Sequence, residues 1–191
     1  SVTGVYYHTG GIRAYPELLE ATLRKCYPAV QLRVSNAGIS GHTSAEGLAR
    51  LERDVLSRRP SVVTVMFGLN DMLATPLPTF QSNLSQIVSA CRSAGAEVVL
   101  CTPNDIEDDG RRTSLKLESY ADAIRETARD KNVAVADVHR AFQVVRQRDP
   151  RQFSLFLSDA IHPNLDGHRL IAATLAESIA NAWTAASVGP M

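Results

Sequence analysis

The feature of this sequence that most restricts its fold is an alternation between short, β-branched apolar runs and longer amphipathic segments. Runs of the first kind are typical of buried strands, and apolar residues spaced three or four positions apart are typical of helices. The candidate strands are Gln31–Ser35, Ser61–Phe67, Ala96–Thr102 and Asn132–Ala136. Strands joined through helices lie parallel in one sheet, and the helices cover its faces. The sequence therefore predicts an α/β fold.

Helical spacing of apolar residues is clearest between the second and third candidate strands. Phe80, Leu84, Ile87, Val88 and Cys91 form one apolar stripe there, and similar stripes occur within residues 18–26, 45–55, 117–128 and 171–183. A stripe of this kind marks the face that a helix buries against a core. We therefore assign these residues to core packing and not to ligand binding. The charged run 105–112 (DIEDDGRR) is expected to be an exposed polar loop.

Charge, hydropathy and length exclude several classes of protein. The 20 Lys and Arg residues are balanced by 20 Asp and Glu residues, so the chain lacks the basic surface of a nucleic-acid binder. The apolar runs are much shorter than the ~20 residues of a membrane-spanning helix, which predicts a soluble protein without membrane insertion. Cytoplasmic and secreted locations both stay open. With 191 residues and no linker-like segment, residues 1–191 are expected to form a single domain.

The three cysteines, Cys26, Cys91 and Cys101, cannot all pair within one chain. Their spacing matches neither a zinc site nor a CxxC redox site. We expect them to be small buried residues in helices and at the end of a strand.

Polar residues follow the candidate strands, where ligands bind in open parallel sheets. Near the chain's end, the DAIHPN motif places Asp159 three positions before His162. On a turn these side chains point to the same side, so the carboxylate can orient the imidazole as a base. This arrangement is the second half of a hydrolase triad. The alternative is that Asp159 caps the helix that Pro163 opens and that His162 is an incidental surface residue.

Two further strand ends carry candidate donors for an oxyanion. Asn70, in the GLND motif after the second strand, can present its side-chain NH₂ group, and Gly38, in NAGIS, can offer a backbone N–H. The alternative for GLND is simple turn and cap chemistry, because Asn70 and Asp71 are common residues of turns.

Four segments taken together resemble a known family. Ser1-Val-Thr-Gly, NAGISGHTS, FGLND and SDAIHPN occur in the order of the four sequence blocks of the SGNH (GDSL-type) hydrolases. The resemblance implies that Ser1 is the nucleophile, His162 the base and Asp159 its orienter, with Gly38 and Asn70 in the oxyanion hole. It implies no cofactor and no metal. It also implies a three-layer α/β/α sandwich around a flavodoxin-like parallel sheet of about five strands.

The sequence departs from the family pattern at its first residue. In the family, a Gly-Asp pair and a central strand precede the nucleophile, and neither stands before Ser1 here. A sheet without an interior strand leaves buried backbone groups unpaired. We therefore expect the native protein to have residues upstream of Ser1 that supply this first strand. The alternative is that the Ser1 α-amine acts as the base, as in N-terminal nucleophile hydrolases, which use a different architecture and leave His162 without a role.

The activity that the resemblance implies is hydrolysis of carboxylic esters through an acyl-serine intermediate. Tyr6 and Tyr7 are candidate substrate contacts near the mouth of the site, because tyrosine rings suit sugar faces and planar acyl groups; core packing is their alternative. The sequence shows no long apolar lid, so we expect a short, acetyl-type acyl group, with carbohydrate esters as candidate substrates.

Besides a catalytically inactive relative that serves protein contact, three other classes of function remain open. The first is a lysophospholipase or thioesterase of the same family. The second is a non-catalytic, flavodoxin-like binding module, although no Gly-rich phosphate loop supports it. The third is a metal-dependent hydrolase using Asp159, His162 and His168, which match no known ligand spacing. The sequence leaves the oligomeric state undetermined.

Overall fold

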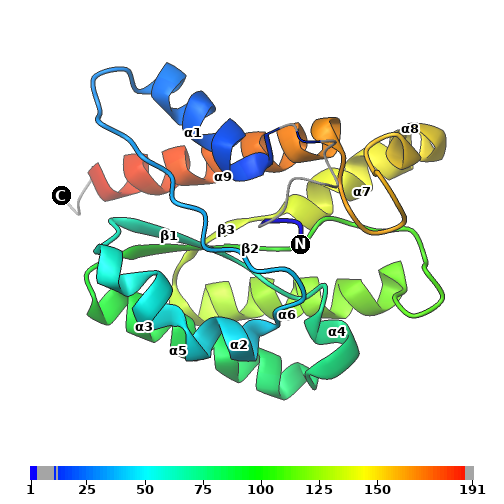
Figure 1. The fold of residues 1–191 in the computed structure, drawn as a ribbon, viewed down its shortest axis with the longest axis horizontal. Helices are drawn as coiled ribbons and strands as arrows, with labels where there is room; N and C mark the ends of the chain where they lie inside the picture. Colours follow the sequence, from blue (N-terminus) through cyan, green and yellow to red (C-terminus); the bar gives the residue numbers. More distant parts are fainter. Residues whose placement is uncertain (4–10, 12, 188–191) are drawn as a thin grey trace.

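The computed structural model describes residues 1–3, 11 and 13–187. Within these residues, three parallel strands form one sheet in the order β1-β2-β3 (Figure 1). The strands are β1 (Val62–Met66), β2 (Glu97–Cys101) and β3 (Ala134–Ala136). Each lies inside a candidate strand predicted from the sequence, and the predicted α/β class is confirmed.

Helices cover both faces of the sheet, which gives the expected three-layer arrangement. The helices α1, α7 and α9 lie on one face, and α2, α3, α5 and α6 lie on the other (Figure 1). Their bounds are α1 Tyr15–Cys26, α2 Ser44–Ala49, α3 Leu51–Asp54, α4 Asp71–Ala74, α5 Leu77–Ser93, α6 Ser114–Lys131, α7 Val138–Arg148, α8 Pro150–Ser154 and α9 Leu165–Ser187, with a 3₁₀ turn at Leu56–Arg58. None of the helices in the described residues is both long and apolar enough to cross a membrane.

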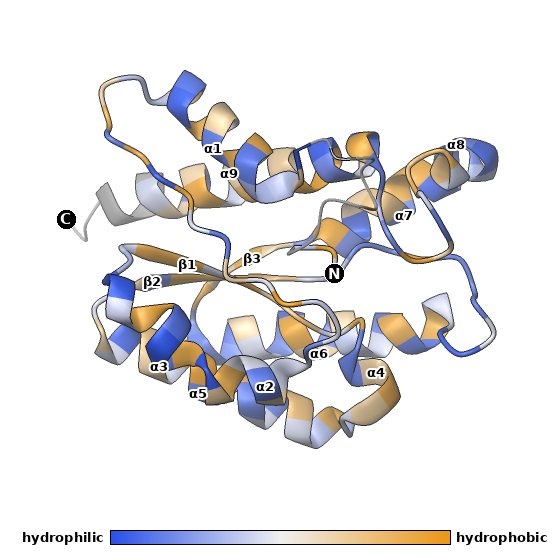
Figure 2. Cartoon of the chain, in the orientation of Figure 1, coloured by the Kyte–Doolittle hydropathy of each residue, from blue (hydrophilic) through white to orange (hydrophobic). Residues whose placement is uncertain are grey.

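The strand β2 joins the two halves of the core. Val98 and Leu100 belong to the cluster that packs against α5 and α6, whereas Val99 and Cys101 pack against α1, α7 and α9. Successive side chains of a strand point to opposite faces, so a central strand with both faces covered is apolar throughout. Figure 2 shows the strands mostly in hydrophobic colours and the helices banded with hydrophilic and hydrophobic residues. Burial of Val98, Val99 and Leu100 stabilises the fold by about 1.5–3 kcal/mol for each side chain.

The predicted stripe of α5 is buried over its whole length, from Phe80 to Cys91. The prediction for Cys26 is wrong, because this residue ends α1 beyond the helix's buried stripe and is exposed. Cys91 and Cys101 are buried as expected, and burial raises the pKa of their thiols to about 11 and about 12. Both therefore stay protonated at neutral pH and behave as apolar side chains.

In the described part of the chain the sheet has three strands, where about five were expected. Gln31–Ser35, predicted as a strand, forms no ladder with any described residue, so that prediction is wrong for this structure. A cavity of about 850 Å³ is lined by residues 30–39 on one side and by β1 on the other.

Candidate active site

The structure brings Ser1, His162 and Asp159 into one hydrogen-bonded line at the carboxyl ends of the strands. The Oγ atom of Ser1 lies 2.7 Å from Nε2 of His162, although 161 positions separate the two residues. On the other side of the ring, Nδ1 of His162 lies 2.8 Å from Oδ2 of Asp159. A hydroxyl, an imidazole and a carboxylate in this order form the arrangement that activates a serine nucleophile.

A tight turn holds Asp159 against His162. Oδ1 of Asp159 accepts backbone N–H groups from Ile161 at 2.9 Å and from His162 at 2.8 Å. Burial alone would raise the pKa of Asp159, but these hydrogen bonds and the His162 ring outweigh it and lower the pKa. Asp159 therefore stays ionised at neutral pH. The cap at the start of α9 is Asn164, whose Oδ1 accepts the N–H groups of Asp166 and Gly167, so Asp159 has no capping role there.

The segment that carries Gly38 is tied to the chain near Ser1. Asn36 donates from Nδ2 to the carbonyl oxygen of Thr3 at 2.6 Å. The backbone N–H of Gly38 donates to Oδ1 of Asn36 at 2.8 Å, so the expected oxyanion donor already has a partner in this structure. A few residues on, Thr43 caps α2 through a capping box in which its backbone N–H donates to the carboxylate of Glu46 at 2.8 Å.

Asn70 stands at the exit of β1, beside the segment that carries Gly38. Its Nδ2 donates to the carbonyl oxygen of His42 at 3.1 Å. The next residue, Asp71, is fully buried and accepts the N–H and hydroxyl of Ser44 through Oδ1 and the N–H of Gly68 through Oδ2. One carboxylate thereby fastens the start of α2 to the end of β1, which fixes the two candidate oxyanion segments relative to each other.

The turn of residues 159–162, called the triad turn below, is hydrogen-bonded to the segment that follows β2. Asn104 is fully buried and donates from Nδ2 to the carbonyl oxygen of Ile161 at 3.0 Å. Beside it, the N–H of Glu107 donates to the carbonyl oxygen of Ala160 at 2.8 Å. Both bonds reach the peptides directly before His162. The segment after β2 therefore helps to set the position of the imidazole.

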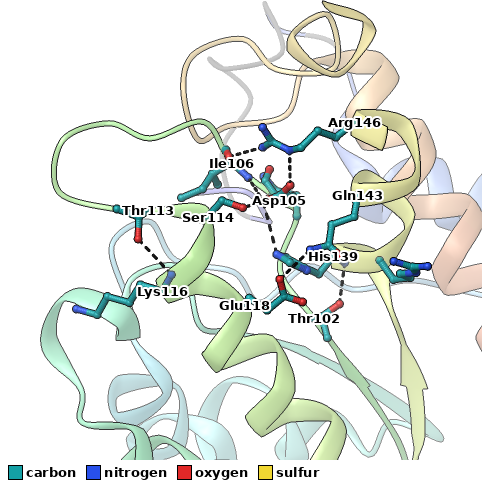
Figure 3. A network of polar contacts seen from close by, with 12 residues as sticks. Thr102, Asp105, Ile106, Thr113, Ser114, Lys116, Glu118, His139, Gln143 and Arg146 are labelled. Carbon is teal, nitrogen blue, oxygen red and sulfur yellow. Dashed lines mark hydrogen bonds and ion pairs between the residues drawn. The ribbon is translucent and has the colours of Figure 1, made fainter. Parts of the chain in front are cut away.

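Asp105 anchors this segment in a buried polar network (Figure 3). Its carboxylate accepts hydrogen bonds from Ser114 Oγ at 2.6 Å, from Arg146 Nε at 2.8 Å and from the N–H of Ile106 at 2.9 Å. Arg146 also donates to the carbonyl oxygen of Ile106 at 2.6 Å. The expectation that residues 105–112 form an exposed loop is thus wrong for Asp105 and Ile106, because paired partners allow a charged group to be buried.

Ser1, Gly38, Asn70 and Asn104 all line the 850 Å³ cavity, so the candidate nucleophile and both candidate donors face the same space. The predicted substrate contacts Tyr6 and Tyr7 lie outside the described residues.

Within the described residues, His168 does not join Asp159 and His162 in a metal-ligand arrangement. His168 is buried in α9, where its Nδ1 accepts the backbone N–H of Tyr15 at 3.2 Å. Across the part of the chain that the structure describes, no three His, Cys, Asp or Glu side chains gather in a metal-ligand arrangement.

Comparison with known proteins identifies the family. The model of the GDSL-like lipase/acylhydrolase family matches residues 1–170. The chain belongs to this family. Like the family's members with esterase names, it is an ester-hydrolysing enzyme and not a non-catalytic binding module. A serine triad and an oxyanion hole are typical of GDSL-like hydrolases.

Relatives of the GDSL-like chain include esterases and a thioesterase. It is 28% identical over 185 residues to an acetylxylan esterase of Geobacillus stearothermophilus, covering 88% of this chain and 82% of the relative. It is 30% identical over 175 residues to thioesterase 1/protease 1/lysophospholipase L1 of Escherichia coli (strain K12), covering 91% and 77%. Its fold matches the crystal structure of the acetyl xylan esterase AlAXEase with a TM-score of 0.79 at 25% identity, covering 89% of this chain and 93% of that one.

Sequence reasoning missed several residues that shape the site. The sequence predicts only a turn or cap role for Asp71 and assigns none to Asn104 or to Arg112, whose Nε donates to the carbonyl oxygen of Leu69 at 3.1 Å. One local signal for Asp71 was present in the sequence, because it directly follows Asn70 at a strand end. A carboxylate at that position has to be paired if the strand end is buried. Asn104 and Arg112 act across many positions of the chain, and local patterns carry no sign of such contacts.

Proposed function

We propose that this enzyme hydrolyses short-chain carboxylic esters, acetyl esters first among them, through an acyl intermediate on Ser1. The observation that carries the proposal is the continuous line from Ser1 Oγ through the His162 ring to Asp159, with contacts of 2.7 Å and 2.8 Å. Residues 1–191 act as one domain in this proposal. The acetylxylan esterase among the relatives supports an acetyl ester, and a carbohydrate acetate is the first substrate to test.

The chemistry starts with transfer of the Ser1 proton to Nε2 of His162 as the oxygen attacks the ester carbonyl carbon. The tetrahedral intermediate collapses when the bond to the alcohol oxygen breaks and His162 returns the proton to the leaving alcohol. Water then attacks the acyl-serine, again with His162 as base, and releases the acid and free Ser1. Asp159 keeps the proton on Nδ1 and stabilises the imidazolium that forms in each step.

The negative oxygen of each tetrahedral intermediate is stabilised by Asn70 and Gly38. An amide nitrogen carries two hydrogens, so the bond from Asn70 to the His42 carbonyl oxygen leaves the second for the substrate. The Gly38 N–H has to share its hydrogen with the substrate or exchange its Asn36 partner for it. Tyr6 and Tyr7 are proposed contacts for the acyl group or the sugar.

A second candidate substrate class is the acyl thioester or lysophospholipid, which the relative from Escherichia coli suggests. The two classes differ in acyl length, so a panel of esters distinguishes them. We suggest p-nitrophenyl acetate, butyrate and octanoate, an acetylated xylo-oligosaccharide and palmitoyl-coenzyme A. The proposal expects the highest kcat/KM on acetyl esters; a maximum on octanoate or palmitoyl-coenzyme A would favour the second class.

The role of Ser1 is tested by Ser1→Ala, with Ser40→Ala as the control, because Ser40 is an exposed serine of the segment that carries Gly38. Removal of a triad nucleophile is expected to lower kcat by at least ~10³. A fluorophosphonate probe is expected to label wild-type protein and Ser40→Ala but not Ser1→Ala. Labelling of Ser1→Ala at the wild-type rate would show that another residue is the nucleophile.

The oxyanion role of Asn70 predicts a different kinetic signature. Loss of one donor to a developing oxyanion costs ~10²–10³ in turnover, and it leaves ground-state binding nearly unchanged. Asn70→Ala is therefore expected to lower kcat by this factor with KM within about threefold. Unchanged turnover in Asn70→Ala would remove this residue from the oxyanion hole.

A further inference from the structure

The guanidinium of Arg112 reaches the exit of β1 from the loop of residues 105–112. Its Nε donates to the carbonyl oxygen of Leu69 at 3.1 Å, and its Nη2 lies 3.5 Å from Oδ1 of Asn70. The third nitrogen, Nη1, pairs with Oδ2 of Asp109 at 2.9 Å. Only 14% of the Arg112 side chain is exposed. One side chain thus contacts both the amide of Asn70 and the peptide that precedes it.

The loop that delivers Arg112 is fixed at both ends. At its far end, Asp109 accepts the backbone N–H groups of Arg111 at 2.8 Å and of Arg112 at 2.6 Å. The bond from the Arg112 N–H contributes most to a lowered pKa of Asp109, so this carboxylate stays ionised. At its near end, the carboxylate of Asp105 is bonded to Ser114 and Arg146 (Figure 3). The guanidinium is therefore held in place before any substrate arrives.

These contacts determine which way the Asn70 amide faces. In the structure, Oδ1 is turned to the cationic Arg112 and Nδ2 to the carbonyl oxygen of His42. A flipped amide would place NH₂ against the guanidinium and an oxygen against a carbonyl oxygen, so both contacts would become repulsive. A cation beside Oδ1 also draws electron density from Nδ2, which makes its free hydrogen a stronger donor to a negative oxygen.

We propose that Arg112 is a positioning residue for the reaction: it fixes and polarises the Asn70 amide so that one N–H meets the oxyanion of the tetrahedral intermediate. The inference rests on the proposed ester hydrolysis and on the oxyanion role of Asn70. It gives the charged loop a function that its composition did not indicate. Arg112 itself does not touch the substrate, so its contribution is limited to what Asn70 supplies.

The kinetic test compares Arg112→Ala with Arg111→Ala, on the full protein with p-nitrophenyl acetate. The two variants remove the same charge from neighbouring positions, but the Arg111 side chain is exposed. Arg112→Ala is expected to lower kcat about 10- to 100-fold, with KM within threefold. A residue that acts only through Asn70 cannot cost more turnover than the loss of the Asn70 amide does. Arg111→Ala is expected to keep kcat within twofold. Equal kcat values for the two variants would overturn the proposal.

A double-mutant cycle separates positioning from a general structural effect. If Arg112 acts through Asn70, Arg112→Ala changes kcat less than threefold in an Asn70→Ala background, where no amide is left to position. If Arg112→Ala lowers kcat by the same factor in the wild-type and the Asn70→Ala backgrounds, Arg112 acts by another route. Added methylguanidinium is expected to restore part of the turnover of Arg112→Ala and none of that of Asn70→Ala.

An NMR measurement that does not depend on catalysis tests this inference separately from the proposed function. In ¹⁵N-resolved NMR spectra, the Asn70 side-chain amide signals are expected to shift in Arg112→Ala and to stay in place in Arg111→Ala. Unshifted signals in Arg112→Ala would disprove the contact even in a fully active esterase. By contrast, a wild-type protein that cleaves no ester, or a Ser1→Ala variant that keeps turnover, would disprove the proposed function while the amide shift still reports on Arg112.

Discussion

Replacing Asp105 with asparagine removes the charge at the centre of the network that supports the triad turn. The Asp105 side chain is 1% exposed and lies 2.8 Å from Arg146 Nε. Burial alone would raise the pKa of Asp105, but the neighbouring His139 ring, the hydrogen bonds from Ser114 and the backbone of Ile106, and the charge of Arg146 outweigh burial and lower the pKa to about 2. The folded protein therefore holds this carboxylate in its ionised form more strongly than the unfolded chain does.

The size of the effect follows from the shift of the pKa. The reference value is 3.8 and the folded value is about 2, so the ionised carboxylate contributes about 2 kcal/mol to the free energy of unfolding. Because the folded pKa is lowered, this contribution is complete above about pH 5 and is lost as the pH falls from about 4 to about 2; about 1 kcal/mol of it is gone by pH 3. Arg146 is 33% exposed and can turn to water in the variant, which limits the damage. We expect Asp105→Asn to destabilise the protein by about 2–4 kcal/mol at pH 7.

The assay is urea denaturation of wild type and Asp105→Asn at pH 7, 5, 4 and 3, with the difference in unfolding free energy followed against pH. The difference is expected to be constant from pH 7 to 5 and to shrink by about 1 kcal/mol at pH 3. Asp130→Asn is the control: its side chain is 73% exposed and 3.9 Å from Arg129, so its effect is expected to be small at every pH. A difference for Asp105→Asn that does not depend on pH would refute the reasoning.

Three further variants test other parts of the structure. Asp159→Asn keeps the shape of the triad turn but no longer holds the proton on Nδ1 of His162, so kcat on p-nitrophenyl acetate is expected to fall ~10³–10⁴-fold; a loss below tenfold would contradict the triad. In Gly167→Ala, the new Cβ lies 2.4 Å from the carbonyl oxygen of Phe156, and thermal unfolding is expected to show a loss of about 1–3 kcal/mol; an unchanged Tm would mean that the backbone there yields freely. Phe80→Ala empties a site of 0% exposure in α5 and is expected to cost about 3–5 kcal/mol in urea denaturation; a cost below 1 kcal/mol would place Phe80 outside the tightly packed core.

Local periodicity was enough to predict much of the fold. The strands β1, β2 and β3 and the buried stripe of α5 follow from spacings of two and of three to four residues, which are set by backbone geometry within the segment itself. Gln31–Ser35 has the composition of a strand but pairs with no described residue, because a strand needs a neighbour and composition does not provide one. Cys26 matched the stripe of α1 and is nevertheless exposed, since a helix's last residue can lie beyond the surface that covers the rest.

The site could be predicted only where its contacts are local or where the family pattern supplied them. Asp159 and His162 are three positions apart, and their contact followed from that spacing. The meeting of Ser1 with His162 came from the resemblance, because no spacing rule links residues so far apart. The contact between Arg112 and Asn70 spans 42 positions and joins a charged loop to a strand end, so only the folded chain reveals it.

The separation of Ser1 and His162 by 161 positions has a consequence for biogenesis. Residues 1–162, including the turn before α9, have to be synthesised before the proposed nucleophile Ser1 can meet the proposed base His162. In the proposed mechanism, partly made chains that lack His162 are therefore inactive toward esters. In refolding experiments, the recovery of ester cleavage is expected to report when Ser1 and His162 come together, and such distant pairings form slowly in proteins that are dominated by them.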